Sequence, residues 1–347
     1  MQRVKRLFGS GLSLILSISG LMATTSMVEA AESPIAIAIH GGAGTLNPKS
    51  MTKKDRLALQ DALASAVRAG YAVLEGGGSS LDAVTVAVQR LEDSPRFNAG
   101  VGAVMNWDGE HELDASIMRG DTMEAGAVAG VRTIKSPIAL ARLVMERSPH
   151  VMLSGTGAEE FADAFELERV SNDYFTTPNR KSAWRFWRDQ QGAKVSRSIE
   201  ERSGTVGAVA IDRSGLLAAA TSTGGMTGKR WGRIGDSPVI GAGNWADNRS
   251  CAVSATGHGE FFIRHNVAAN ICARVRLKGE RIGKAANYVI NKELVAAGGD
   301  GGVIAIGADG EVALPFNTPG MYRAVIDRDG KLRVGFHKRW LRIPSTP

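Results

Sequence analysis

The stretch GTVGAVAID (204–212) follows a polar, charge-rich segment and begins a new series of apolar runs. The fold predicted for the chain depends most on this stretch. Its apolar run Val206–Ile211 and the next run, Leu216–Thr221, are separated by a turn-forming Asp-Arg-Ser-Gly sequence, a pattern that predicts a β-hairpin. Thr205 precedes the first strand, and the second strand ends in TSTGGMTG (221–228). The hairpin therefore brings hydroxyl groups and glycines to the ends of predicted strands.

Outward from this hairpin, strands come in runs and helices are grouped between the runs. Apolar runs predict further strands at residues 35–39, 101–106, 112–118, 125–131, 239–242, 252–255, 303–306 and 312–315. Apolar residues at helical spacing predict helices at 52–75, 79–92, 137–145, 260–276 and 283–297. Because strands and helices do not alternate one for one, this order favours an α+β protein over a doubly wound parallel sheet.

The composition is that of a globular protein, with 347 residues of which 44% are apolar and 22% are charged. The formal net charge is +7, and basic residues crowd together near the C-terminus: Arg323, Arg328, Lys331, Arg333, Lys338, Arg339 and Arg342. A nucleic-acid-binding surface would combine such charge with stacking aromatic residues or a known binding motif, and neither is evident. We therefore expect this basic segment to be a solvated edge, and we expect no nucleic-acid partner.

The first 30 residues have the layout of a secretory signal peptide. Three basic residues precede an apolar stretch from about Leu12 to Met22, and Val28-Glu-Ala30 resembles a small-residue cleavage site. We expect the segment to be removed, which leaves an exported, periplasmic or secreted protein without membrane attachment; an uncleaved anchor is the alternative. In an exported protein Cys251 and Cys272 can form a disulfide, but two buried free thiols fit the sequence equally well.

Several common catalytic and binding motifs are missing. The chain has no Gly-x-Ser-x-Gly sequence, no P-loop and no pair of histidines at zinc-ligand spacing. The glycine-rich runs 40–44 and 126–130 lack the spacing of a nucleotide-binding loop. Four other clusters carry hydroxyl, guanidinium and carboxylate groups, at residues 204–207, 221–228, 232–238 and 255–260. Strand ends and helix starts that face one side would gather these groups in a single cleft.

Eight short runs, taken in order, resemble a known family. The early runs are AIHGGAG (38–44), FNAGVGAV (97–104), HELDASIM (111–118) and GAVAGV (126–131). The later runs are GTVGAVAID (204–212), AATSTGGMTGK (219–229), GRIGDSPVIGAG (232–243) and ALPFNTPGMYR (313–323). Together they resemble the isoaspartyl peptidase/plant-type asparaginase family of N-terminal-nucleophile hydrolases. The resemblance implies a four-layer αββα sandwich of two β-sheets between two helix layers, made from a precursor that cuts itself.

The resemblance also implies how the chain is divided. Cleavage between Gly204 and Thr205 would give an α subunit of residues 31–204 and a β subunit of residues 205–347, which share one folded domain. Two such αβ heterodimers would pair into a heterotetramer. Residues from about 165 to 203 correspond to the family's variable linker, and we expect its second half to be mobile. Cleavage frees the α-amino group of Thr205, whose reference pKa of about 7.7–8.0 suits it to act as the base for its own hydroxyl.

The remaining catalytic roles follow from the resemblance, position by position. Thr205 would be the nucleophile, and Thr223 would orient its hydroxyl. Thr256 and the backbone N–H of Gly257 would form the oxyanion hole, which stabilises charge that develops in the transition state.

Substrate-binding roles follow in the same way. Arg233 would bind the substrate α-carboxylate, for which its planar guanidinium is suited. Asp236 would bind the α-ammonium group with help from the Gly259 carbonyl, and Asn98 would help to position the scissile bond. No cofactor is required for this chemistry. A structural sodium ion would be held by the backbone carbonyls of Leu91, Glu92, Ser94, Phe97, Ala99 and Val101.

The function implied is hydrolysis of β-aspartyl amides, namely isoaspartyl dipeptides and L-asparagine. One alternative is a glycosylasparaginase, which shares fold and nucleophile but places an Asp-Thr-type pair at the cut where this chain has Gly204-Thr205. The other is an unprocessed relative that binds an amino acid without turnover. His258 departs from the small or hydroxyl residue common at its position, and the balance between peptide and asparagine stays open.

Overall fold

The computed structural model describes residues 33–44, 51–191 and 204–341 of the chain. These ranges belong to one folded unit, Glu32–Pro347. The predicted signal segment, residues 1–30, lies outside the described residues. Within the ranges that are described, no helix has both the length and the apolar character needed to cross a membrane.

The described elements follow one another as strand runs separated by helices. The strands are β1 (Ala36–Gly44), β2 (Leu113–Arg119), β3 (Ala125–Val131), β4 (Met152–Ser154), β5 (Val206–Ile211), β6 (Leu217–Thr223), β7 (Asn244–Asp247), β8 (Cys251–Gly257), β9 (Gly301–Gly307), β10 (Val312–Ala313), β11 (Gly320–Ile326) and β12 (Leu332–Gly335). The α-helices are α1 (Lys53–Glu75), α2 (Ser80–Glu92), α3 (Pro137–Arg147), α4 (Gly155–Asp163), α5 (Pro178–Gln191), α6 (Gly259–Arg264), α7 (Val267–Lys278), α8 (Ile282–Tyr288) and α9 (Leu294–Ala296). A 3₁₀-helix, η1 (Asn172–Phe175), and a π-helical turn, η3 (Val289–Glu293), complete the set.

The strands form two sheets. The larger sheet has eight strands in the order β12-β11-β1-β5-β6-β2-β3-β4, and the smaller has four in the order β10-β9-β8-β7. All pairings are antiparallel except β3 with β4. A central eight-stranded sheet flanked by helices makes this a mixed α+β protein, which confirms the α+β part of the predicted fold class.

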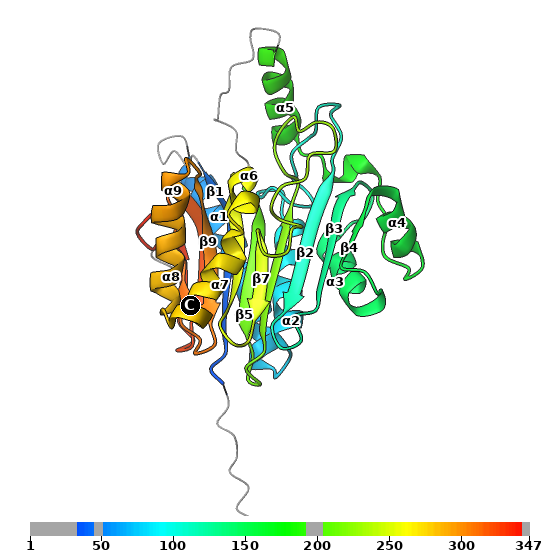
Figure 1. The fold of residues 1–347 in the computed structure, drawn as a ribbon. Helices are drawn as coiled ribbons and strands as arrows, with labels where there is room; N and C mark the ends of the chain where they lie inside the picture. Colours follow the sequence, from blue (N-terminus) through cyan, green and yellow to red (C-terminus); the bar gives the residue numbers. More distant parts are fainter. Residues whose placement is uncertain (1–32, 45–50, 192–203, 342–347) are drawn as a thin grey trace, which may run out of the picture. The chain divides into compact units, whose positions relative to one another are not determined.

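Alternation along the strands directs side chains to separate apolar clusters. In β5, Ala208 and Ala210 face a cluster shared with α1, α2 and α3, whereas Val209 and Ile211 face a second cluster that includes Ile304 of β9. A third cluster lies between the other face of the small sheet and helices α7 and α8. Figure 1 shows α7 crossing in front of β7, with which it is in contact.

Three sequence-based assignments are wrong, for local reasons. Residues 101–106 form a loop instead of a strand, because Gly100 and Gly102 have φ values of +48° and +93° that turn the chain. The strand expected at 239–242 begins later, as β7. The helix expected over 260–276 is broken into α6 and α7, since Asn266 adopts a left-handed conformation with φ of +45°.

The basic C-terminal segment is not wholly a solvated edge, because Arg323 of β11 is only 3% exposed. Its guanidinium donates to the Met321 and His337 carbonyls and lies over the Trp340 ring. Burial lowers the pKa of Arg323 to about 10. Carbonyl and ring contacts thus replace the water that was expected around this side chain.

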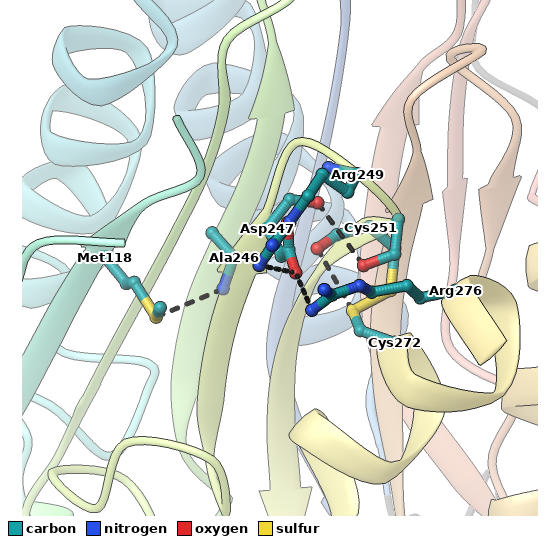
Figure 2. The surroundings of a disulfide bond; sticks show 8 residues. Met118, Ala246, Asp247, Arg249, Cys251, Cys272 and Arg276 are labelled. Atoms are coloured by element: carbon teal, nitrogen blue, oxygen red, sulfur yellow. Dashed lines mark hydrogen bonds and ion pairs between the residues drawn. A yellow bond between two sulfur atoms is a disulfide. The ribbon is translucent and has the colours of Figure 1, made fainter. Parts of the chain in front are cut away.

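The two cysteines are joined in a disulfide, which decides between the alternatives that the sequence left open. The Cys251–Cys272 bond links β8 of the small sheet to α7, which packs on it. Figure 2 shows Asp247 beside this bond, in contact with the guanidinium groups of Arg249 and Arg276. The disulfide and the Asp247–Arg276 ion pair both join α7 to the small sheet, whereas the Asp247–Arg249 pair lies within the turn between β7 and β8.

The predicted linker, about 165–203, contains helical structure in its described part. Phe175 of η1 is fully buried, and α5 follows after Thr177, whose Oγ1 accepts the Arg180 N–H at 3.2 Å. This hydrogen bond and Pro178 at the first helical position form a normal helix start. The predicted mobile stretch overlaps α5, and its residues 192–203 lie outside the described residues.

Candidate active site

Thr205 lies at the start of β5, the position to which the sequence pattern assigned the nucleophile. Its side chain is 7% exposed, and its Oγ1 donates to Oγ1 of Thr223 across 3.1 Å. Its backbone N–H donates to Oγ1 of Thr256 at 3.1 Å. β5 and β6 are adjacent antiparallel strands, so the hairpin predicted from the sequence places Thr205 and Thr223 together.

The peptide bond between Gly204 and Thr205 is packed against the end of β1. A Cβ on Gly42 would lie 2.6 Å from the Cα of Gly204, and Gly42 has a φ of +112°. The next residue, Ala43, donates its N–H to Oγ1 of Thr256 at 3.2 Å. Thr256 Oγ1 therefore accepts the backbone N–H groups of both Ala43 and Thr205. Glycine is needed at position 42 for the close approach of the two backbone segments.

A buried histidine holds the carbonyl group of Thr205. His40 Nδ1 lies 2.9 Å from the Thr205 carbonyl oxygen, and its Nε2 lies 3.0 Å from Ser254 Oγ. Since a carbonyl only accepts, Nδ1 donates and Nε2 accepts from Ser254. Burial lowers the pKa of His40 to about 3, so the ring is neutral at working pH and holds one tautomer.

Thr223 and Asn98 are linked by hydrogen bonds to the same backbone residue, Gly225, in the loop after β6. Thr223 Oγ1 accepts the Gly225 N–H at 3.0 Å, and Asn98 Nδ2 donates to the Gly225 carbonyl at 2.8 Å. Asn98 Oδ1 accepts the Val104 N–H at 2.8 Å. Asn98 thus fixes the turn beside the nucleophile and acts on the site through Gly225.

A small pocket opens directly beside Thr205 and collects most of the predicted site residues. It is lined by Thr205, Thr223, Gly225, Met226, Arg233, Gly235, Asp236, Ser237, Gly257 and His258. Thr256 lies beneath Thr205, and a Cβ on Gly259 would come within 2.9 Å of Asp236 Oδ1. The four clusters singled out in the sequence therefore meet at one place.

Asp236 is a buried carboxylate with unused hydrogen-bonding capacity. It is 4% exposed, and among the described residues its Oδ2 has no hydrogen-bond partner. Burial raises the pKa of Asp236 to about 7, and the nearby positive charge of Arg233 counteracts only part of this rise. The pocket thus presents an acceptor that a cationic group can satisfy.

Arg233 is held by Glu260, a residue of the 255–260 cluster to which the sequence assigned no role. Its Nε and Nη2 donate to the two carboxylate oxygens of Glu260, each at 3.0 Å. His258 Nε2 lies 3.2 Å from Oε2 of the same carboxylate. Glu260 uses one edge of the guanidinium, while Nη1 lies beside the pocket residues Gly225 and Gly235. The Arg233–Glu260 ion pair joins the loop after β6 to α6. Because the two residues are far apart in the sequence, their spacing does not predict the contact.

The loop predicted to hold sodium folds back on itself after α2. Val101 donates its N–H to the Glu92 carbonyl at 2.7 Å, and Ser94 donates to the Leu91 carbonyl at 3.2 Å. A Cβ on Gly100 would collide with the Glu92 carbonyl oxygen, so glycine is needed for this reversal. A backbone carbonyl that accepts one hydrogen bond keeps a second lone pair, and hard cations prefer oxygen ligands, so the sodium site on this loop stays a prediction. No group of three metal-binding side chains occurs in the described ranges.

Comparison with known proteins agrees with this arrangement. The chain is 51% identical over 295 residues to an isoaspartyl peptidase of Salmonella typhimurium, covering 83% of this chain and 94% of that protein. It is 51% identical over 295 residues to the isoaspartyl peptidase of Escherichia coli, covering 83% and 91%. It is 41% identical over 314 residues to the human isoaspartyl peptidase/L-asparaginase, covering 90% and 99%. A family model described as asparaginase matches residues 33–336, and the chain therefore belongs to the asparaginase family.

Proposed function

We propose that the chain is a self-cleaving amidohydrolase that hydrolyses isoaspartyl dipeptides and L-asparagine with Thr205 as its nucleophile. The observation that carries this proposal is the Thr205 hydroxyl, hydrogen-bonded to Thr223 at 3.1 Å in a pocket that also presents Arg233 and Asp236. The relatives named isoaspartyl peptidase, at 51% identity, support the same substrate class.

Self-cleavage would begin with attack of the Thr205 hydroxyl on the Gly204 carbonyl carbon. The C–N bond breaks, the nitrogen takes a proton and becomes the α-amino group, and the acyl group of Gly204 is left as an ester on the Thr205 oxygen. Water then hydrolyses the ester, which releases the Gly204 carboxylate and restores the hydroxyl. The packing of Gly42 on Gly204 supports this step, because it restrains the bond that must break.

The freed amine would then serve as the base for amide hydrolysis. The Thr205 hydroxyl attacks the β-carbonyl of the substrate, and ammonia or an amino acid leaves with a proton. Water next hydrolyses the acyl-enzyme to aspartate. Thr256 Oγ1 already accepts two N–H groups, and its own proton has no acceptor among the described residues, so it can donate to the developing oxyanion.

Substrate orientation follows from the charges in the pocket. Arg233 offers N–H groups to the α-carboxylate, and the unpartnered Asp236 oxygen accepts from the α-ammonium group. The Gly259 carbonyl is assigned as a second acceptor. Binding an ammonium ion favours the charged form of Asp236, so substrate binding would lower the raised pKa of this carboxyl group.

The assembly belongs to the same proposal. The two sheets and their outer helices would form the four-layer αββα sandwich of N-terminal-nucleophile hydrolases, divided into subunits 31–204 and 205–347. Two αβ heterodimers would pair, and a sodium ion on the carbonyls of the 91–101 loop would brace the turn that carries Asn98. Export would follow from residues 1–30; a reporter fused after residue 30 that stayed in the cytoplasm would overturn it.

The test is aspartate release by the purified protein from β-aspartyl-leucine, L-asparagine and N-acetylglucosaminyl-asparagine, with Thr205→Ala as the inactive control. We expect hydrolysis of the first two substrates and none with the variant. Preferred cleavage of the glycosylated substrate would instead establish a glycosylasparaginase. Binding of aspartate by an uncut chain without turnover would establish the amino-acid-binding alternative.

A further inference from the structure

The loop that leads to Arg233 has an unusual backbone. We call residues 226–232 the clamp loop, since they connect the turn after Thr223 to the arginine assigned to the substrate α-carboxylate. Gly228, Trp231 and Gly232 all have positive φ, at +71°, +55° and +66°. A bulky residue in this conformation is rare, and such strain persists only where the surroundings hold it. Trp231 is 95% exposed, so its own side chain does not supply that restraint.

A second loop holds the clamp loop through its backbone. Gly228 donates its N–H to the Met105 carbonyl at 2.8 Å, and Trp107 donates its N–H to the Lys229 carbonyl at 2.9 Å. The Arg230 guanidinium lies 3.0 Å from the centre of the Trp107 ring. The 105–109 loop and the clamp loop therefore form one layer.

Helix α5 packs on this layer with two tryptophans. Trp187 lies directly against Gly228, where a Cβ would overlap its ring, and it meets Trp107 edge-to-face at 5.4 Å. Trp184 donates its Nε1–H to the Asn106 carbonyl at 2.8 Å, and its ring lies against Gly109. Figure 1 shows α5 standing beside these loops above β2.

The two tryptophans are three positions apart, so they lie on one face of the helix. Both are half-buried, whereas Phe186 between them is 63% exposed. The helix is otherwise strongly polar, and its aromatic contacts are confined to the face that meets the two loops. A segment that served only as a spacer would need no such face.

We propose that α5 is a positioning element of the substrate site, and that Trp187 and Trp184 hold the clamp loop in the conformation that presents Arg233. This inference rests on the proposed function, because it takes Arg233 to bind the α-carboxylate. After cleavage, α5 belongs to the α subunit and the clamp loop to the β subunit. Helix α5 of the α subunit then remains docked on the clamp loop of the β subunit and sets substrate affinity.

The test compares Trp187→Ala with Phe186→Ala, a matched loss of an aromatic ring from the exposed side of the same helix. In the cleaved enzyme we expect Trp187→Ala to raise KM for a β-aspartyl dipeptide about tenfold with kcat changed less than about twofold, since the arginine is displaced while Thr205 is not. Trp187→Phe should recover most of the affinity. Phe186→Ala should leave both constants unchanged.

A second measurement does not depend on activity. The clamp loop contains the exposed Arg230, and limited trypsin digestion followed by mass spectrometry reports cutting after it. We expect cutting to be at least about fivefold faster in Trp187→Ala than in Phe186→Ala. Equal KM values and equal digestion in an active enzyme would overturn the role of α5. An inactive wild-type protein with faster digestion of the variant would instead contradict the proposed function and leave the docking contact supported.

Discussion

Replacing Asp236 with asparagine should stabilise the protein above neutral pH while it weakens substrate binding. The carboxyl group is buried, and its pKa is raised to about 7 in the folded state. In the unfolded chain an aspartate titrates at about 3.9. The folded protein therefore holds this proton more tightly, and the stability that the protonated group gives is lost as pH rises from about 4 to about 7.

The change in unfolding free energy follows from the difference between the pKa of Asp236 in the folded protein and its pKa in the unfolded chain. About three pKa units correspond to about 4 kcal/mol of unfolding free energy lost at pH 8, of which about one third is already lost at pH 5. Asparagine at position 236 does not titrate, so its own fit in the pocket adds only an offset that is independent of pH. The stability gained by Asp236→Asn should then grow by roughly 2 to 3 kcal/mol between pH 5 and pH 8, or about 5 °C in Tm.

Thermal unfolding from pH 4 to pH 9 measures this difference, with both chains carrying Thr205→Ala so that they stay uncut. The difference in Tm between the two chains should rise through pH 5–7 and be flat above pH 7. Parallel pH profiles would show that the pKa of Asp236 is not raised by folding, because Asp236 would then be ionised in the folded state as readily as in the unfolded chain. In the cleaved enzyme, Asp236→Asn should raise KM, since a neutral amide attracts the substrate ammonium group less.

Three further changes have defined outcomes. Thr256→Val should lower kcat about 100- to 1,000-fold and slow self-cleavage, because an oxyanion donor is lost, and cleavage time courses check it. Glu260→Gln should raise KM severalfold with little change in kcat, since the Arg233 guanidinium loses its charged anchor; an unchanged KM would contradict that role. Reduction of the Cys251–Cys272 bond, whose cysteines are 21 residues apart, should cost about 3 kcal/mol in urea unfolding, and no shift would contradict the bond.

The hairpin and the long amphipathic helices could be predicted from the sequence because their signals are local. Ser79 caps α2 through the Asp82 N–H, and the Asp-Arg-Ser-Gly turn is closed by hydrogen bonds to Asp212 Oδ1. β11 and β12 were not predicted, although Met321 and Val325 are buried, because they lie among basic residues that suggested an exposed edge. In this segment the basic residues along the sequence suggest exposure, whereas the fold buries the apolar residues between them, and these buried residues form the strands.

The site was predictable to the extent that family motifs mark it. The motifs assigned Thr205, Thr223, Arg233 and Asp236, and the structure places these four residues in one pocket. The support around them was not visible, since the contacts of Glu260, His40 and Trp187 join segments that are far apart in the chain. Trp187 in particular lies in a stretch without a sustained apolar stripe, so its contacts with Gly228 and Trp107 left no periodic signal in the sequence.

Self-cleavage and the role of Thr205 are tested most directly by the intact mass of the purified protein beside that of Thr205→Ala, with N-terminal sequencing of each fragment. We expect two wild-type fragments, the second beginning at Thr205, and a single uncut chain for the variant. A wild-type chain that stays whole on long incubation would contradict this expectation, because the Thr205 nitrogen would remain an amide and could not act as the base.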